Sequence, residues 1–429
     1  MVSIFIHRLI MRSAFAVTLT ASVAFSEAQV PALSLVEAVK LAVSQSRLLD
    51  AASLQVSSAR DMAVAAGQLP DPVLKLGINN LPINGDDRFN LTRDFMTMRS
   101  IGVMQEFTRE DKLRARRMRF EKEAEAAESS HDFAMATVQR GAAMAWLERY
   151  FLERMVDLLV KQRNEAKLQI EAADATYRGG RGTQSDVFSA RYSVAQIEDR
   201  LAIAERQVKT SKTQLARWVG SAAEQTLGKL SIIDALPFEE THLESHLQQN
   251  PQFAVLLKQE EMAQVDVDLA RANKRSDWSA EIMFNQRGPA FSNMISINVS
   301  LPFQWDQKKR QDREVAAKQA TALQRRAERD DALRVHVAEI RAILQEWQGN
   351  RARLSRYDES VVPLSAERTL AAMAAYRGGT VTGGTLSAVL EARRGEIEVR
   401  MERLKLEMDT ARLWAQLNFL TSPECSHEN

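Results

Sequence analysis

The chain of 429 residues is poor in cysteine, proline and glycine, with one, 10 and 17 of them. The lone cysteine, Cys425, excludes a disulfide within the chain. Few helix-breaking residues, together with 26% charged and 45% hydrophobic residues, indicate an ordered and helix-rich protein. A formal net charge of +1 gives no reason to expect a nucleic-acid partner.

Long hydrophobic runs and catalytic motifs are also missing. No interior stretch approaches the roughly 20 uninterrupted apolar residues that a membrane-spanning helix requires, so any membrane crossing must use strands. We find no catalytic triad, phosphate-binding glycine loop or metal-ligand cluster, and therefore expect neither an enzyme nor a cofactor. His242 and His246 are one helical turn apart, but without a third ligand nearby they predict no metal site.

The N-terminus predicts export. His7, Arg8 and Arg12 precede an apolar run over 14–25, and the Ser-Glu-Ala sequence ending at Ala28 has small residues where a signal peptidase cleaves. We expect residues 1–28 to be a signal peptide. A retained anchor is the alternative, although the apolar run is short for one. No cysteine follows the signal, which excludes an N-terminal lipid anchor.

A Tyr-Arg-Gly-Gly sequence occurs twice, at 177–180 and at 376–379. Each copy closes a long helical pattern and opens another, which indicates a duplicated module. Glycine at a helix end accepts the left-handed conformation of a C-cap, so each copy also predicts a reversal between two antiparallel helices. We assign 29–225 to the first structural repeat, 226–421 to the second and 422–429 to a C-terminal tail.

Both repeats have the same predicted order of elements: a helix, a β-hairpin, a very long helix and a return helix. The first repeat has a helix from about 34 to 66, a hairpin at 73–107, a long helix at 111–176 and a return helix at 185–218. The second has a helix at 251–274, a hairpin at 278–303, a long helix at 311–375 and a return helix at 386–420. A helix of that length would extend roughly 100 Å if continuous, which suits a coiled coil or the wall of a tunnel.

Each hairpin alternates apolar and polar residues, as over 74–79, 280–285 and 295–301. In a soluble protein the apolar face would cover a core, whereas in a membrane barrel it would contact lipid and the polar face would line water. Alternation alone does not choose between these. Four strands are too few to close a barrel, so the membrane interpretation requires an oligomer.

Short motifs carry a resemblance to a known family. Each glycine turn is followed by a Val-Phe/Leu-x-Ala-Arg pattern, at 187–191 and at 389–393. With these motifs, nearly the whole mature chain resembles the TolC-type outer-membrane efflux proteins. The stretches 80–82, 91–99 and 101–106 look most like the outer-membrane members of heavy-metal export systems, of the CzcC and CusC kind.

The resemblance implies a mainly α-helical protein with a membrane β-barrel. A homotrimer would form one twelve-stranded barrel in the outer membrane, continued by an α-helical barrel in the periplasm. Its partners would be outer-membrane lipids, a periplasmic adaptor (membrane fusion protein) and an inner-membrane pump of the resistance-nodulation-division (RND) type. The chain would passively conduct substrates, heavy-metal cations above all. The alternatives are a channel for drugs and a periplasmic coiled-coil adaptor or scaffold, which would share the helices but not the hairpins.

The resemblance also implies functional positions. In the family, the glycine turns form the periplasmic tips that meet the adaptor, and here the matching residues are Tyr177, Gly179, Gly180, Tyr376, Gly378 and Gly379. Past the second tip, relatives carry two acids that ring the closed tunnel mouth, where this chain has Ala388 and Glu391. Asp186 is the first-repeat counterpart of Ala388. Asp186 and Glu391 are thus the gate candidates; alternatively, they are solvated acids near the positive end of a helix dipole.

The chain departs from the family pattern in two places. CusC-like members carry a lipid-anchoring cysteine after the signal, which this chain lacks. Ser46-Arg47 stands where the family has Asn-Pro, a pair present at Asn250-Pro251. Basic runs follow both hairpins, over 112–119 and 308–313, and we interpret both as anchors at the inner rim of the outer membrane.

Overall fold

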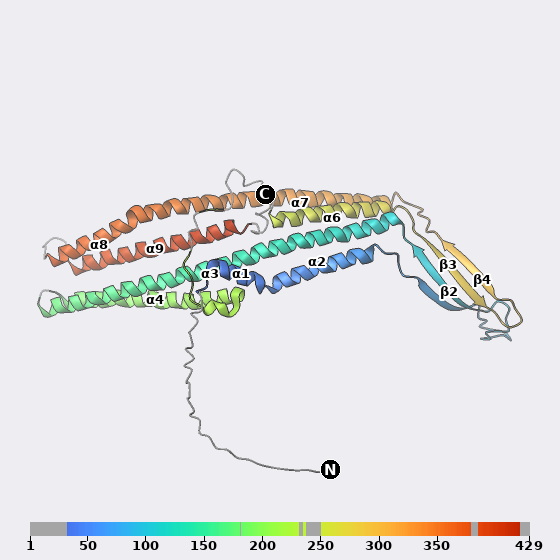
Figure 1. Ribbon diagram of the computed structural model, residues 1–429, viewed down its shortest axis with the longest axis horizontal. Coiled ribbons are helices and arrows are strands. Elements are labelled where there is room, and N and C mark those ends of the chain that lie inside the picture. The colour runs from blue at the N-terminus through green and yellow to red at the C-terminus, as the bar shows by residue number, and fades with distance from the viewer. Residues whose placement is uncertain (1–31, 181, 231–234, 237–249, 379–384, 421–429) are drawn as a thin grey trace, which may run out of the picture.

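The computed structural model describes residues 32–180, 182–230, 235–236, 250–378 and 385–420. The predicted signal peptide, the histidine pair at 242 and 246, Gly379 and the C-terminal tail lie outside these residues. The molecule is strongly elongated, with a β-sheet at one end and two helix-to-helix turns at the other (Figure 1).

The first helical stretch consists of two helices, α1 (Leu35–Ser44) and α2 (Arg47–Ala66), where the sequence predicts one. The break occurs because the Ser46 hydroxyl accepts a hydrogen bond from the Leu49 backbone N–H at 3.4 Å and so begins a new helix. Asn250 caps α6 (Pro251–Ala272) in the same way. Ser46 therefore supplies the helix start that Asn-Pro supplies in the second repeat.

One antiparallel sheet unites the two hairpins in the order β1-β2-β3-β4. Its strands are β1 (Val73–Asn79), β2 (Met98–Phe107), β3 (Trp278–Gln286) and β4 (Met294–Ser300). The repeats join where β2 pairs with β3, with Ile101 opposite Phe284. Strands from distant parts of the chain thus form a single surface.

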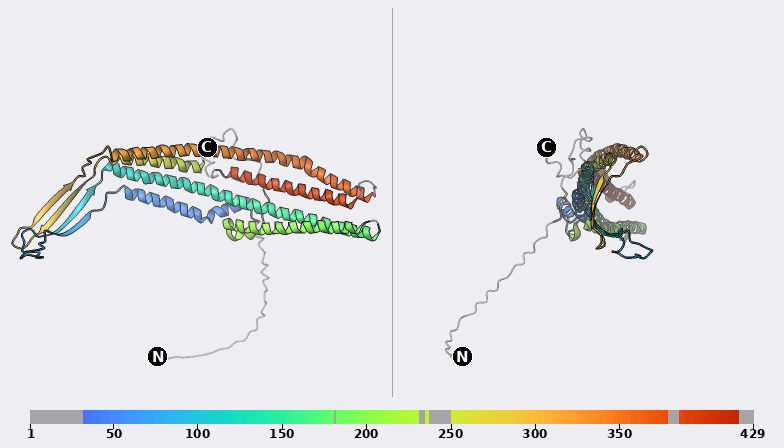
Figure 2. Two further views of the ribbon diagram at one scale, coloured as in Figure 1. Left: turned by 180° about the vertical axis from the view of Figure 1, so that it is seen from behind. Right: turned by 90° about the vertical axis from the view of Figure 1, so that its right-hand side faces the viewer.

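Two long helical hairpins and a short 3-10 helix, η1 (Gly220–Glu224), are the remaining helical elements of the described chain. The first consists of α3 (Glu110–Arg178) and α4 (Gln184–Val219), and the second of α7 (Gln311–Arg356), α8 (Val362–Arg377) and α9 (Leu386–Asn418). From behind, the hairpins lie side by side along the length of the molecule (Figure 2). Their apolar faces meet in a core around Trp146 of α3, which α1, α4 and α9 also line.

The sequence predicts one long helix over 311–375. The structure instead has a π-turn, η3 (Tyr357–Val361), between α7 and α8. Pro363 explains this, because it has no N–H and its ring conflicts with the carbonyl four residues earlier. Helix α9 holds the turn from the side: Tyr357 donates to Glu402 at 2.9 Å, and Arg403 donates to both carboxylate oxygens of Asp358 at 2.7 and 3.0 Å.

Four charges join α3 to α6. Lys122 and Lys258 each bridge the carboxylates of Glu125 and Glu261, at 2.8 to 3.2 Å. Hydrogen bonds from Lys258 and Lys122 hold the pKa of Glu125 below its usual value of 4.5. The bond to Glu125 raises the pKa of Lys258 above 10.5. This stabilisation is therefore present between about pH 5 and 10.

We expect the double variant Glu125→Gln/Glu261→Gln to flatten the acid side of the stability profile. A depressed carboxylate pKa stabilises the fold above the unfolded-state value and loses that effect as the pH falls. Because the groups are partly exposed, the loss at pH 7 should be about 1 kcal/mol or less. Thermal unfolding at pH 3 to 7 measures it. Glu110→Gln, which removes the more exposed pair with Arg114, is the control; an equal change in both variants would contradict the assignment.

Candidate functional site: the helical tips and the two-faced sheet

The first tip closes through Gly180. This residue has φ +69°, a left-handed conformation that glycine adopts at little cost. Its N–H donates to the Tyr177 carbonyl at 3.0 Å. A Cβ at Gly180 would meet nothing within 4 Å, so the requirement is conformational and not steric. Gly179 is the C-cap of α3 with φ −78°, which any residue adopts.

The second tip has the same C-cap as the first but a different environment for its tyrosine. Gly378 caps α8 with φ −74°, and Gly379 lies outside the described residues. Tyr376 packs against the apolar cluster between the hairpins, and its hydroxyl lies 3.4 Å from the hydroxyl of Thr176 on α3. Tyr177, its counterpart in sequence, is exposed. The two tips thus contact each other through one tyrosine and leave the other on the surface.

Asp186 takes part in a capping box at the start of α4. Its carboxylate accepts from the backbone N–H and the hydroxyl of Thr183 at 2.9 and 2.7 Å, and the Thr183 hydroxyl accepts from the Asp186 N–H at 3.2 Å. This geometry satisfies backbone donors that a helix start leaves unpaired. The side chain therefore has a structural role at the start of α4.

Glu391 has no capping role. It lies on the first turns of α9, with one carboxylate oxygen 3.8 Å from Arg368 on α8, and the two side chains are 77% and 65% exposed. Contacts this long and exposed contribute little to stability. The two gate candidates, Asp186 and Glu391, lie on separate hairpins, at the starts of α4 and α9.

A buried acid near the tips is not evident from the family motif. Glu396 of α9 is almost fully buried, accepts from Arg400 at 2.8 Å and pairs with Arg393 at 3.2 Å. Arg393 also reaches Glu165 on α3 at 3.2 Å, which ties the hairpins together. The sequence does contain a signal for this buried acid. Arg393 and Arg400 lie three residues before and four residues after Glu396, a spacing that brings side chains together on one helix face.

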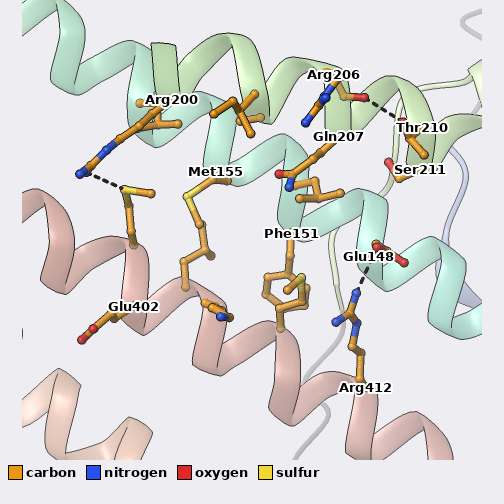
Figure 3. Close-up of a pocket in the computed structure, with 18 of the residues that line it drawn as sticks. Glu148, Phe151, Met155, Arg200, Arg206, Gln207, Thr210, Ser211, Glu402 and Arg412 are labelled. Atoms are coloured by element: carbon orange, nitrogen blue, oxygen red, sulfur yellow. Dashed lines mark hydrogen bonds and ion pairs between the residues drawn. The ribbon is translucent and has the colours of Figure 1, made fainter. Parts of the chain in front are cut away.

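Farther from the tips, a cavity of about 900 Å³ lies between α3, α4 and α9. Phe151 and Met155 form its apolar floor, while Glu148 pairs with Arg412 at its rim at 3.1 Å (Figure 3). Charges of both signs line the opening. In the part of the chain that the structure describes, no group of three His, Cys, Asp or Glu residues is arranged to hold a metal ion.

The sheet has one apolar face across all four strands. Its paired residues form two exposed rows, Leu74-Val103-Ile282-Ile297 and Leu76-Ile101-Phe284-Ile295. The sheet projects past the ends of the helices, which leave this face uncovered (Figures 1 and 2).

The other face of the sheet is polar and internally bonded. Asn79 donates to Ser100 at 3.0 Å and Asn285 to Ser296 at 2.9 Å. Lys75 of β1 pairs with Glu281 of β3 across the intervening strand, where Gly102 is opposite Lys75 and has no side chain to obstruct the contact. A Cβ at Gly102 would lie 2.4 Å from the Met283 side chain, so this position requires glycine.

No helix in the described ranges is long and apolar enough to cross a membrane.

No protein-family model and no curated protein sequence matches the chain. Solved structures do match. The outer-membrane channel OprN aligns with a TM-score of 0.74 at 15% identity, over 90% of this chain and 89% of its own. CusC, described as forming a transmembrane channel, aligns at 0.73 and 15%, over 90% and 92%. The outer-membrane protein VceC of Vibrio cholerae aligns at 0.68 and 18%, over 89% and 96%. The chain therefore has the fold of these outer-membrane proteins, and the predicted arrangement of four strands with long antiparallel helices is confirmed.

Proposed function

We propose that this chain is a subunit of an outer-membrane efflux channel of the TolC type. It conducts substrates passively from an inner-membrane RND pump and a periplasmic adaptor across the periplasm and the outer membrane. The observation that carries the proposal is the uncovered apolar face of the sheet. Eight exposed apolar side chains in two adjacent rows are unfavourable in water, and lipid is the solvent that accepts them.

Closure of the sheet requires further copies of the chain. β1 and β4 are the edges of the described sheet, and an open edge leaves backbone N–H and C=O groups without partners, which the hydrocarbon region does not tolerate. Pairing β4 of one copy with β1 of the next removes every edge, and three copies give a twelve-stranded barrel. The apolar face then contacts lipid, the polar face lines the lumen, and the helical hairpins form the periplasmic tunnel.

The helical turns are the proposed periplasmic end. Tyr177, Gly179 and Gly180 at one tip, and Tyr376, Gly378 and Gly379 at the other, would meet the adaptor. Glu391 is the stronger gate candidate, because among the described residues its exposed carboxylate is held only by a long contact with Arg368. The carboxylate of Asp186 accepts hydrogen bonds in the capping box, and its negative charge would add to that of Glu391 at the tunnel mouth.

Heavy-metal cations are the proposed substrates, supported by the resemblance of 80–82 and 91–106 to metal-export members and by the fold shared with CusC. A deletion strain should lose tolerance to at least one of copper, silver, zinc, cobalt and cadmium. Unchanged metal tolerance with raised drug sensitivity would contradict this substrate class and leave the channel itself intact.

The channel is tested directly by fractionation and conductance. The full chain should occur in the outer-membrane fraction as a trimer that dissociates on heating, and the purified trimer should conduct ions across a planar bilayer. A soluble periplasmic monomer would contradict the proposal and favour an adaptor or scaffold.

Glu391→Gln should lower the preference of the open channel for cations over anions. Three carboxylates at the mouth concentrate cations, an effect whose size we expect to be on the order of tenfold or less, because the groups are exposed. The reversal potential across a salt gradient measures it. Glu398→Gln, on the same helix, is the matched control for loss of an exposed acid. An identical reversal potential in both variants and the parent would exclude Glu391 from the gate.

A further inference from the structure

Two aromatic side chains follow β4 and are highly exposed to solvent. Phe303 and Trp305 are 81% and 89% exposed, and their rings meet edge to face with centroids 5.8 Å apart. Leu301, also exposed, connects them to the apolar face of the sheet. Aromatic rings of this kind are favoured where hydrocarbon meets the polar headgroups of a membrane.

Four cations follow within eight residues of Trp305. They are Lys308, Lys309, Arg310 and Arg313, all exposed. Among the described residues, none of their side chains has an ion pair. The two acids of the segment bind elsewhere: Asp306 accepts a hydrogen bond from the Lys309 backbone N–H at 3.2 Å, and Asp312 pairs with Lys274 at 2.7 Å. The segment therefore carries several charges that the chain itself does not neutralise.

The basic run after the first hairpin is different, although both runs look alike in the sequence. Arg116 apart, its cations are paired: Lys112 with Asp277, Arg114 with Glu110, Arg117 with Glu121 and Arg119 with Asp266. Lys112 is also buried. The prediction that both runs anchor the rim is therefore refined, because among the described residues the second run offers four unpaired cations to an external anion and the first offers only Arg116.

We propose that residues 303–313, the aromatic-basic segment, bind the phosphate groups of anionic phospholipids at the periplasmic rim of the barrel. Phe303 and Trp305 enter the interface, and Lys308, Lys309, Arg310 and Arg313 face the headgroups. The order of the segment fits this position: apolar strand, then aromatic rings, then three unpaired cations, then helix α7 with Arg313 in its first turn. The inference rests on the proposed function, since it needs the sheet to be in a membrane.

The test uses the full-length trimer in nanodiscs of phosphatidylcholine with a minor fraction of phosphatidylglycerol. Lipids retained after mild detergent exchange are quantified by mass spectrometry. We expect severalfold enrichment of phosphatidylglycerol over the bulk, reduced by salt, because exposed charges are screened. The variant Lys308→Gln/Lys309→Gln/Arg310→Gln/Arg313→Gln should fall to the bulk ratio. Arg114→Gln/Arg117→Gln, which removes cations already paired, should stay enriched.

Brominated phospholipids give a second readout that needs no loss of charge. They should quench a tryptophan fluorescence component that disappears in Trp305→Phe. If the fourfold variant does not assemble, Lys308→Gln/Lys309→Gln should show intermediate enrichment.

Two outcomes would overturn this inference and leave the channel standing: an inserted trimer without enrichment, or equal enrichment in the fourfold variant. Crosslinking of Lys309 to a carboxylate of a second copy would also overturn it and assign the segment to the subunit interface. Failure of the chain to insert would overturn the proposed function itself.

Discussion

Replacing Ile297 with arginine is expected to prevent assembly of the chain in the outer membrane. Ile297 is exposed at the centre of β4, in a row with Val103 and Ile282 on the apolar face. An arginine on the lipid face near the bilayer midplane costs about 2–4 kcal/mol, and a trimer would bear that cost three times. Heat-dissociable trimers should disappear from the outer-membrane fraction.

The next residue provides the matched control. Asn298 points to the polar face, where its amide lies 3.5 Å from the carboxylate of Glu281. Asn298→Arg adds the same side chain one residue away, but towards water and beside an acid. We expect normal trimers whose current shifts towards anions. If Ile297→Arg assembled as well as Asn298→Arg, the apolar face would not be in lipid, and the proposed function would be wrong.

The strands were predictable because their period is visible in a short window. Alternation over 74–79 and 295–301 identifies a strand and its apolar face without knowledge of the partner. The pairing of β2 with β3 was not predictable in that way. Their residues are far apart in the chain, and alternation says which face a residue takes but not which strand lies beside it.

The helix interruptions show a different limit. Serine caps helices but also occurs within them, so Ser46 alone does not predict a break in the helix. Pro363 is conspicuous in the sequence, yet the helix continues through a π-turn instead of ending there. The contacts of α9 with that turn, through Arg403 and Glu402, come from another part of the chain.

At the tips, the repeated motif predicted the reversals but not the environments. Tyr177 and Tyr376 are identical in local sequence, but only Tyr376 has Thr176 beside its hydroxyl. The difference comes from the packing of one hairpin on the other, which a local motif does not encode. The capping role of Asp186 was readable, since a threonine three residues before an acid is a helix-start signature.

Trp146→Ala should strongly destabilise the helical core. Trp146 is fully buried, stacks on Tyr150 at 5.1 Å and donates its indole N–H to the Leu33 carbonyl at 2.9 Å. Truncation of a buried tryptophan costs about 3–5 kcal/mol through lost contacts and the cavity that remains. The carbonyl of Leu33 would also lose one of its two donors, and would keep the Gly228 N–H at 2.9 Å.

A comparison with Trp347 separates the stability lost through packing from the stability lost with the hydrogen bond. It holds the corresponding place in the second long helix and is nearly as buried, but its indole nitrogen has no hydrogen-bond partner among the described residues. Trp146→Phe should therefore cost more than Trp347→Phe, by about 0.5–1.5 kcal/mol for the lost hydrogen bond, because the Leu33 carbonyl keeps the Gly228 N–H as a donor at 2.9 Å. Denaturant unfolding followed by far-UV circular dichroism measures both, with the exposed Trp305→Phe as the control. Equal losses in the two buried variants would show that packing alone, and not the bond to Leu33, accounts for the stability that Trp146 contributes.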